Sequence, residues 1–293
     1  MNIRPPMRAG TFYEGSAVTL RQHAQKLLEQ ADQYLRTATL PPRLYGGLVP
    51  HAGWMYSGAI AAATFKALHQ VSPLECVILL GADHTGSARA GEVYDSGEWQ
   101  TPIGSVAVDA DLAEALIQGG SVLRPNPRAH AYEHSIEVQV PLLHVLAPQV
   151  RIVPIMVPPE GVALEVGAVI GDVLSRWPKS VAVVASSDLS HHGGHFPAPG
   201  GSGSAGVRWA VKNDQRLLEL VTILASDKVL PEVGARGNAC GAGAIAAAMA
   251  ACRRLGATQG ISLGYTNSYD VVHKAMPDDP DDTTVGYAAM VFA

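Results

Sequence analysis

The sequence predicts a mixed α/β fold, in which a largely parallel central sheet is flanked by helices. Short apolar runs alternate along the chain with longer amphipathic stretches, which is the pattern of alternating strands and helices. Hydrophobic residues make up 47% of the 293 residues, enough for a large core. Glycine occurs 30 times and aromatic residues make up only 6%, which favours close packing of helices on a sheet.

The predicted elements cover most of the chain. A first strand ends within residues 46–50 and leads into a helix that ends near His69. Residues 76–81 form an apolar run typical of a buried strand. A helix over residues 109–118 is closed by Gly119 and Gly120. Further helices are predicted at residues 135–146, 163–176, 207–224 and 240–255, and further strands at 151–157, 181–186, 261–265 and 285–292.

Two segments between these elements are predicted to be irregular. Residues 193–206 contain Pro197, Pro199 and a Gly-Ser run, which predicts a mobile loop. Residues 276–284 are acidic and contain proline, which predicts a solvated surface loop. Neither segment interrupts the alternation enough to indicate a second domain, so we expect one domain over residues 1–293.

Charge and hydropathy argue against several classes of protein. The formal net charge is −5 and no Lys/Arg-rich run occurs, whereas nucleic-acid binding needs a basic surface. The longest uncharged apolar stretch, residues 239–252, is too short to span a bilayer. The first residues lack the apolar segment of a secretory signal. We therefore expect a cytoplasmic protein that binds neither nucleic acid nor membranes.

Polar clusters follow three of the predicted strands. His51 comes after the first strand, His84 after the second, and Asp188 and His191 after the strand that ends at Ser186. In open α/β sheets, ligands bind in the crevice beyond the carboxyl ends of the strands. A single histidine at such a place is usually an ordinary loop residue, but three strand ends with histidine and nearby glycine predict a shared functional site.

Cys240 lies between glycines just before an Ala-rich helix. The positive end of a helix dipole stabilises a thiolate, which is the form that binds metals or attacks substrates. The alternative is a small buried residue at a tight helix start. The other two of the three cysteines, Cys76 and Cys252, stand in apolar surroundings and are expected to be inert core thiols.

Residues 133–137 open a predicted helix and bring a further histidine, His134. Either the acids simply favour the helix N-terminus, or His134 lines the pocket and a carboxylate orients a ligand imidazole. His192 and His195 are expected to face solvent from the mobile loop. The remaining histidines are expected to be structural or exposed: His23, His69, His130, His144 and His273.

Two imidazoles and a thiolate suit Fe(II), Cu or Zn, whereas Mg or Ca would prefer oxygen ligands. The residue types do not choose among the three metals. Beside such a metal, Asp188 and His191 are suited to acid/base or hydrogen-bonding roles.

Taken together, the motifs resemble the Memo family, which includes the proteins called AmmeMemoRadiSam system protein B. The resemblance is nearly end to end and rests on the segments at residues 8–13, 49–53, 56–58, 133–137, 186–191, 240–241, 265–268 and 285–289. It implies a fold similar to the class III extradiol dioxygenases, which use non-haem Fe(II). It also implies a metal site of His51, His84 and Cys240, with Asp188 and His191 beside it.

Some positions depart from these patterns. Cys240 stands where the dioxygenases have a carboxylate ligand, which argues against ring cleavage and makes Cu(I) a credible metal. The second motif usually reads Gly-Pro-Ser-His-His, but here Asp83 precedes His84 and Thr85 follows it. Asp83 could orient a ligand or bind the metal itself. Ala244 stands where the family often has proline.

Three functions are compatible with these residues. The first is a redox-active metalloprotein or oxygenase-like enzyme that acts on a small or aromatic molecule. The second is an adaptor that binds peptides in the crevice, although no Arg cluster suited to phosphate is present. The third is a zinc-dependent hydrolase.

The resemblance further implies a radical SAM enzyme and an AMMECR-type protein as partners. The chain itself lacks a three-Cys cluster motif, so we expect it to be a partner and not the radical generator.

Overall fold

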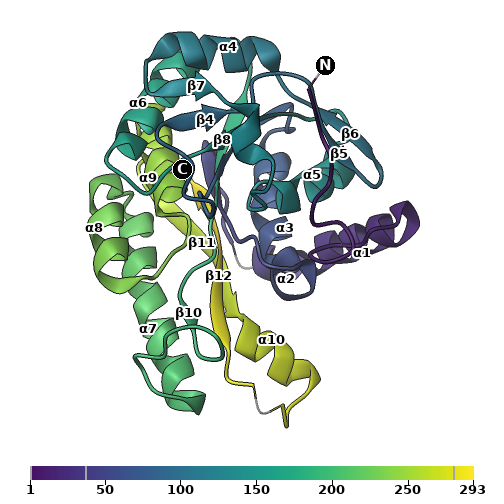
Figure 1. Cartoon of the computed structure of the whole chain (residues 1–293), viewed down its shortest axis with the longest axis vertical. Helices are drawn as coiled ribbons and strands as arrows, with labels where there is room; N and C mark the ends of the chain where they lie inside the picture. The colour runs from purple at the N-terminus through teal and green to yellow at the C-terminus, as the bar shows by residue number, and fades with distance from the viewer. Residues whose placement is uncertain (1, 37, 280) are drawn as a thin grey trace.

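The computed structural model describes residues 2–36, 38–279 and 281–293, and a large mixed sheet runs through its centre (Figure 1). Four parallel strands form the middle of this sheet, in the order β2, β9, β3 and β8. Their bounds are β2 Gly46–Val49, β9 Val181–Ser186, β3 Cys76–Gly81 and β8 Arg151–Met156. The α/β class predicted from the sequence is confirmed.

Antiparallel strands extend the sheet on both sides. Beyond β8, β4 (Gly91–Val93) runs antiparallel to β8, and β7 (Leu123–Pro125) runs parallel to β4. On the other side, β12 (Thr284–Phe292) pairs antiparallel with β2 and also with β10 (His191–His192) and β11 (Gly260–Asn267). A separate small sheet contains β1 (Ile3–Arg4), β5 (Glu98–Thr101) and β6 (Gly104–Ala107).

Helices cover both faces because the central strands are apolar on both faces. Val77 and Leu79 of β3 belong to one core cluster, and Ile78 and Leu80 to the other, as the two-residue period of a strand requires. The first cluster contains residues of α1 (Ala17–Gln30), α3 (Trp54–Val71) and α5 (Val140–Leu146). The second contains residues of α4 (Ala110–Gly119), α6 (Val162–Leu174), α7 (Gly203–Thr222), α8 (Ser226–Arg236) and α9 (Ala242–Arg254).

Glycine allows α6 and α9 to pack closely. A Cβ added at Gly167 would lie 2.3 Å from the backbone oxygen of Ala247, and one at Gly171 would lie 2.5 Å from the Arg254 Cβ. Side chains at these positions would force the two helices apart. The abundance of small residues therefore serves the packing of helix on helix as well as helix on sheet.

Most of the predicted core elements are present, with altered bounds. The helix expected at residues 135–146 is a 3₁₀ turn, η2 (Glu137–Gln139), followed by α5. Gly120 ends α4 with extended backbone at φ −178°, so it is not a left-handed cap. The irregular segment after Gly193 is shorter than expected because α7 begins at Gly203. In the acidic segment before β12, Pro280 lies outside the described residues.

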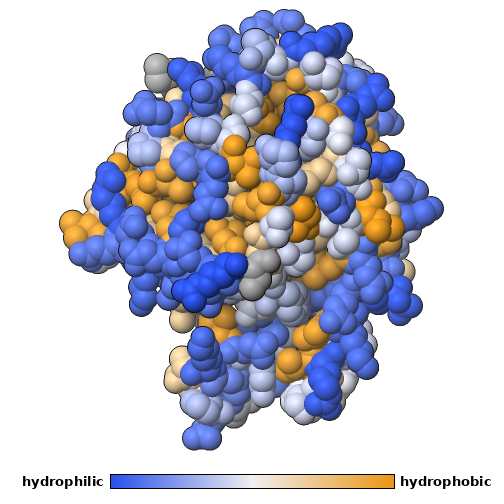
Figure 2. Space-filling view, turned by 180° about the vertical axis from the view of Figure 1, so that it is seen from behind, coloured by the Kyte–Doolittle hydropathy of each residue, from blue (hydrophilic) through white to orange (hydrophobic). Residues whose placement is uncertain are grey.

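Several elements were not predicted, including α1, α8 and α10 (Ser268–Ala275). Short elements also went unrecognised, among them β1, β4, β5, β6, β7, β10, α2 (Asp32–Leu35) and η1 (Pro127–His130). Within the described part of the chain, no helix has the length and apolar character needed to cross a membrane. On the face seen in Figure 2, hydrophobic residues form separate patches among polar ones.

Candidate metal centre

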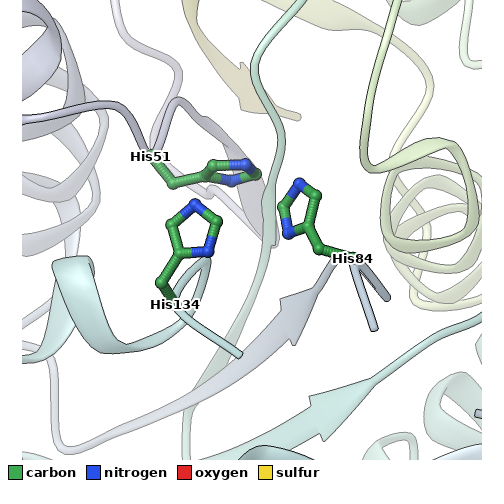
Figure 3. Close-up of side chains that lie close together, drawn as sticks. All are labelled: His51, His84 and His134. Carbon is green, nitrogen blue, oxygen red and sulfur yellow. The ribbon is translucent and has the colours of Figure 1, made fainter. Parts of the chain in front are cut away.

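Histidines from three different segments meet beyond the carboxyl ends of the parallel strands. His51 follows β2, His84 follows β3, and His134 precedes η2. Each offers a ring nitrogen that lies within 4.8 Å of those of the other two. Figure 3 shows the three rings around a common space. The structure thus brings His51 and His84 close together, and His134 lies beside them.

Hydrogen bonds define the orientation of the His51 ring. Its Nδ1 lies 3.1 Å from Ser186 Oγ, and this hydroxyl donates its own hydrogen to the Ser135 carbonyl at 2.8 Å. Because that hydrogen is used, Ser186 Oγ accepts from His51 Nδ1–H. Gln139 also donates to Ser186 Oγ, at 3.1 Å, and to the Pro50 carbonyl, at 2.7 Å. The lone pair of His51 therefore resides on Nε2.

Glu133 orients His84 in the same way. Its carboxylate accepts hydrogen bonds from the Nδ1 of His84 at 3.0 Å and from the backbone N–H groups of His84, His134 and Ser135 at 2.8–2.9 Å. Burial would raise the pKa of Glu133, but these hydrogen bonds and the His84 charge hold it well below its usual range. A carboxylate that accepts from His84 Nδ1–H leaves Nε2 of that ring to face a ligand.

Cys240 reaches the two imidazoles from the loop before α9. Its Sγ lies 3.2 Å from His51 Nε2 and 3.6 Å from the Asp188 carbonyl oxygen. Burial raises the pKa of the thiol and outweighs the lowering effect of the neighbouring His84. The thiolate that we expected at this helix start is therefore not favoured. For His84, burial lowers the pKa, but hydrogen bonding to Cys240 and Glu133 outweighs it and raises the pKa to about 10.

The loop that carries Cys240 is fixed by β9 and the residues after it. The backbone N–H of Cys240 donates to the Asp188 carbonyl at 3.2 Å, and that of Gly241 donates to Ser187 Oγ at 2.8 Å. A Cβ on Gly241 would lie 2.7 Å from the Ser186 backbone oxygen. Only glycine lets the cysteine loop approach the strand end this closely.

A pocket of about 340 Å³ adjoins the histidines, and His134, Asp188 and His191 line it. Burial raises the pKa of Asp188 to about 7, while its Oδ1 accepts the backbone N–H of His51 at 2.7 Å. His191 donates from Nδ1 to the Leu189 carbonyl at 2.9 Å, which leaves Nε2 as its basic atom. Burial lowers the pKa of His191, and it lowers that of His134 to about 4.

Apolar and aromatic side chains form much of the remaining pocket wall. Phe12 comes from the N-terminal segment, Tyr56 from α3, Phe196 from the loop after β10, and Tyr287 from β12. The ends of β10, β12 and α10 extend beyond the rest of the sheet in the lower part of Figure 1. This extension supplies Val272 and Thr283 to the pocket.

Other predicted residues lie elsewhere or behave differently. Asp83 accepts hydrogen bonds from Ser87 N, Ala88 N and Thr85 Oγ1. Both of its carboxylate oxygens therefore stabilise the turn in which it lies. The prediction that His192 faces solvent is wrong, because its ring is buried and packs 5.4 Å from the Trp209 ring. His195 is exposed.

Two thiols lie in the core, and one amide side chain near the site was not predicted. Cys76 and Cys252 are buried core thiols, as expected. Sequence reasoning missed Gln139, which contacts both Pro50 and Ser186. Within the helix predicted from residue 135, Gln139 comes four residues after Ser135, and this spacing could have indicated that the two share a face.

The fold and the site define an α/β protein in which three imidazoles, of which that of His51 is buried, form a cluster suited to a metal ion beside a small pocket. A family model described as "Memo-like protein" matches residues 4–291. A MEMO1 family protein of Methanopyrus kandleri is 35% identical over 99% of this chain and 98% of its own length. One of Thermococcus onnurineus is 32% identical over 99% of both chains. The chain belongs to the Memo-like family.

A solved structure of an uncharacterized protein from Escherichia coli K12 is also similar, with a TM-score of 0.45 and 11% identity. The similarity covers 75% of this chain and 86% of that one.

Proposed function

We propose that the protein is a metal-dependent oxidoreductase that binds iron or copper through His51, His84 and Cys240. Its substrate is a small aromatic molecule in the adjoining pocket, with dioxygen as the electron acceptor. The observation that carries this proposal is the contact of 3.2 Å between Cys240 Sγ and His51 Nε2, because both atoms can donate a lone pair to one cation that displaces the thiol proton.

The short contact of Cys240 with His51 and the orientation of the His134 ring favour Cys240 as the third ligand. Metal–nitrogen bonds of about 2.0–2.1 Å and metal–sulfur bonds of about 2.3 Å place two ligands of one ion roughly 3.1–3.6 Å apart. The Cys240–His51 contact of 3.2 Å lies in this range. In addition, the His134 ring stacks on the His84 ring at an interplanar angle of 24°. Two stacked rings direct their in-plane lone pairs side by side and not toward one point.

The chemistry of the donors fits a redox metal. Hydrogen bonds at Nδ1 of both imidazoles direct Nε2 inward, as is usual for ligand histidines. One thiolate and two imidazoles suit iron, copper or zinc. A bound iron or copper would supply electron transfer at the wall of the pocket.

The side chains that line the pocket would handle protons and position the substrate. Asp188, with a pKa near 7, can hold or release a proton at neutral pH. His134 and His191 are largely neutral because burial lowers the pKa of each, so each can accept a proton. The rings of Phe12, Tyr56 and Tyr287 provide apolar walls for an aromatic substrate.

Metal analysis of anaerobically purified protein tests the ligand set. We expect stoichiometric iron or copper in the natural protein and in Cys252→Ala, which removes a buried thiol away from the site. Cys240→Ala should lose the metal. Unchanged stoichiometric binding in Cys240→Ala would remove Cys240 from the ligand set.

Oxygen uptake in the presence of phenols and catechols tests the activity. His134→Ala should retain the metal while losing oxygen uptake, because His134 faces the pocket in this proposal. Zinc-dependent turnover of esters or amides without oxygen uptake would replace the proposal with a hydrolase. Tight binding of library peptides without any turnover would replace it with an adaptor.

A further inference from the structure

A second cavity, of about 570 Å³, opens at the opposite end of the parallel strands. Tyr45, which lines it, directly precedes β2, and Val181 is the first residue of β9. His51 and Asp188 follow the other ends of these same two strands. Nothing in the metal centre therefore accounts for this cavity.

The lining of this cavity is positively charged although the chain carries a net charge of −5. Arg43, Lys179 and Arg254 line it, and no described lining residue is acidic. Arg254 is engaged in a bidentate pair with Asp172 at 2.5–3.0 Å. Arg43 and Lys179 make no ion pair within the described part of the chain. Two cations are thus available to an incoming anion.

Hydrogen-bond donors accompany these cations. Ser72 and Ser180 bring hydroxyl groups to the lining. A hydroxyl group can donate a hydrogen bond to an oxygen of a bound anion.

Aromatic rings form another part of the wall. The Arg43 guanidinium lies over the Tyr45 ring, 4.7 Å from its centroid. Such a contact leaves the N–H groups of a guanidinium available to an anion. The Trp177 ring stands at the same cavity. A planar group of a ligand would find apolar faces next to the charged donors.

We propose that this cavity binds a small phosphate ester that carries an aromatic ring. The guanidinium of Arg43 and the ammonium group of Lys179 suit the phosphate. The rings of Tyr45 and Trp177 suit the planar group. The cavity volume lies within the usual range for small-molecule sites. This second site is separate from the proposed redox centre.

Calorimetric titration with phenyl phosphate tests the proposal. Phenol and inorganic phosphate, the two parts of that molecule, are titrated separately for comparison. Phenyl phosphate should bind more tightly than either part, and added NaCl should weaken it. The double variant Arg43→Gln/Lys179→Gln should bind about tenfold or more weakly, the loss typical of charge-assisted hydrogen bonds. Arg208→Gln/Lys212→Gln is the matched control, because it removes the same charge from exposed positions on α7.

Two further variants locate the binding. Trp177→Ala removes one aromatic wall of the cavity, so affinity for phenyl phosphate should fall by about fivefold, whereas affinity for inorganic phosphate should not change. Cys240→Ala should leave affinity unchanged, because the metal centre lies at the far strand ends. Equal weakening in both double variants, binding lost in Cys240→Ala, or no binding of phenyl phosphate at all would each overturn the proposal.

Discussion

At the scale of single residues, the centre depends on side chains that do not touch a metal. Ser186, Gln139 and Glu133 determine which nitrogen of each imidazole is protonated. Residue types and their order predicted His51, His84 and Cys240 as partners, because motifs at strand ends are visible in a sequence. The role of Gln139 was not visible, because its contact with Pro50 spans 89 residues.

Ser186→Ala removes the acceptor for His51 Nδ1–H. Without it the ring can rotate or adopt the other tautomer, so we expect metal affinity to fall by about 10–100-fold. Chelator competition measures this affinity. Thr64→Val is the control, since it removes a buried α3 hydroxyl that donates to the Leu48 carbonyl of β2, away from the imidazoles. Equal losses in both variants would contradict the orienting role.

Asp214 predicts a pH dependence of stability. It lies buried on α7, where it accepts the Ser190 N–H at 2.8 Å and the Tyr265 hydroxyl at 2.7 Å. Burial raises its pKa from 3.8 to about 6. Because the folded pKa is raised, the contribution of Asp214 to stability is complete below about pH 4 and is lost as pH rises through about 6.

Asp214→Asn should remove this dependence. Between pH 4 and pH 7 the free energy of unfolding of the variant should rise relative to the natural protein by up to about 3 kcal/mol. Urea denaturation at several pH values measures it. Asp227→Asn, at a largely exposed site, should show no such trend. A difference that does not vary with pH would show that Asp214 titrates normally.

At the scale of elements, the long apolar strands were predictable and the short polar ones were not. β3 and β9 have the bounds that their apolar runs predict, because both faces of each strand are covered. β4, β7 and β10 contain only two or three residues, too few for any periodicity. The burial of His192 likewise depends on α7, where a Cβ on Gly206 would lie 2.3 Å from its ring.

Substitution of helix glycines should have opposite effects at two places. Gly167→Ala forces a methyl group against the α9 backbone and should destabilise the protein by about 1–3 kcal/mol. Gly234→Ala, in α8, meets no atom within 4 Å and should stabilise it by about 0.5–1 kcal/mol. Urea denaturation of both variants is the measurement. Equal effects would mean that α6 and α9 can separate freely.

At the scale of the whole molecule, the N-terminal strand is tied to the metal-site loop. Arg4 is buried, donates to the carbonyls of His130 and Glu133 at 2.9 and 2.7 Å, and lies 2.8 Å from Glu137. Its guanidinium also stacks on Trp99, 4.2 Å from the ring centroid. These partners lie more than 90 residues away in the sequence, and the sequence pattern did not indicate the pairing.

Arg4→Met should cost about 3–5 kcal/mol of stability, because it leaves the Glu137 charge buried without its cation. The double variant Arg4→Met/Glu137→Gln should recover part of this loss. Metal affinity should also fall in Arg4→Met, since the loop with Glu133 loses two hydrogen bonds. Thermal unfolding and chelator competition report the two effects separately. Additive losses in the double variant would show that the two residues are not coupled.

The position of β12 has a consequence for synthesis of the protein. This strand comes late in the chain, yet it lies inside the sheet between β2 and β10. While a ribosome is still making the preceding residues, the hydrogen-bonding edge of β2 has no neighbour on that side. An unprotected edge of this kind recruits other chains. We therefore expect a chain that lacks residues 284–293 to aggregate more readily than the complete chain.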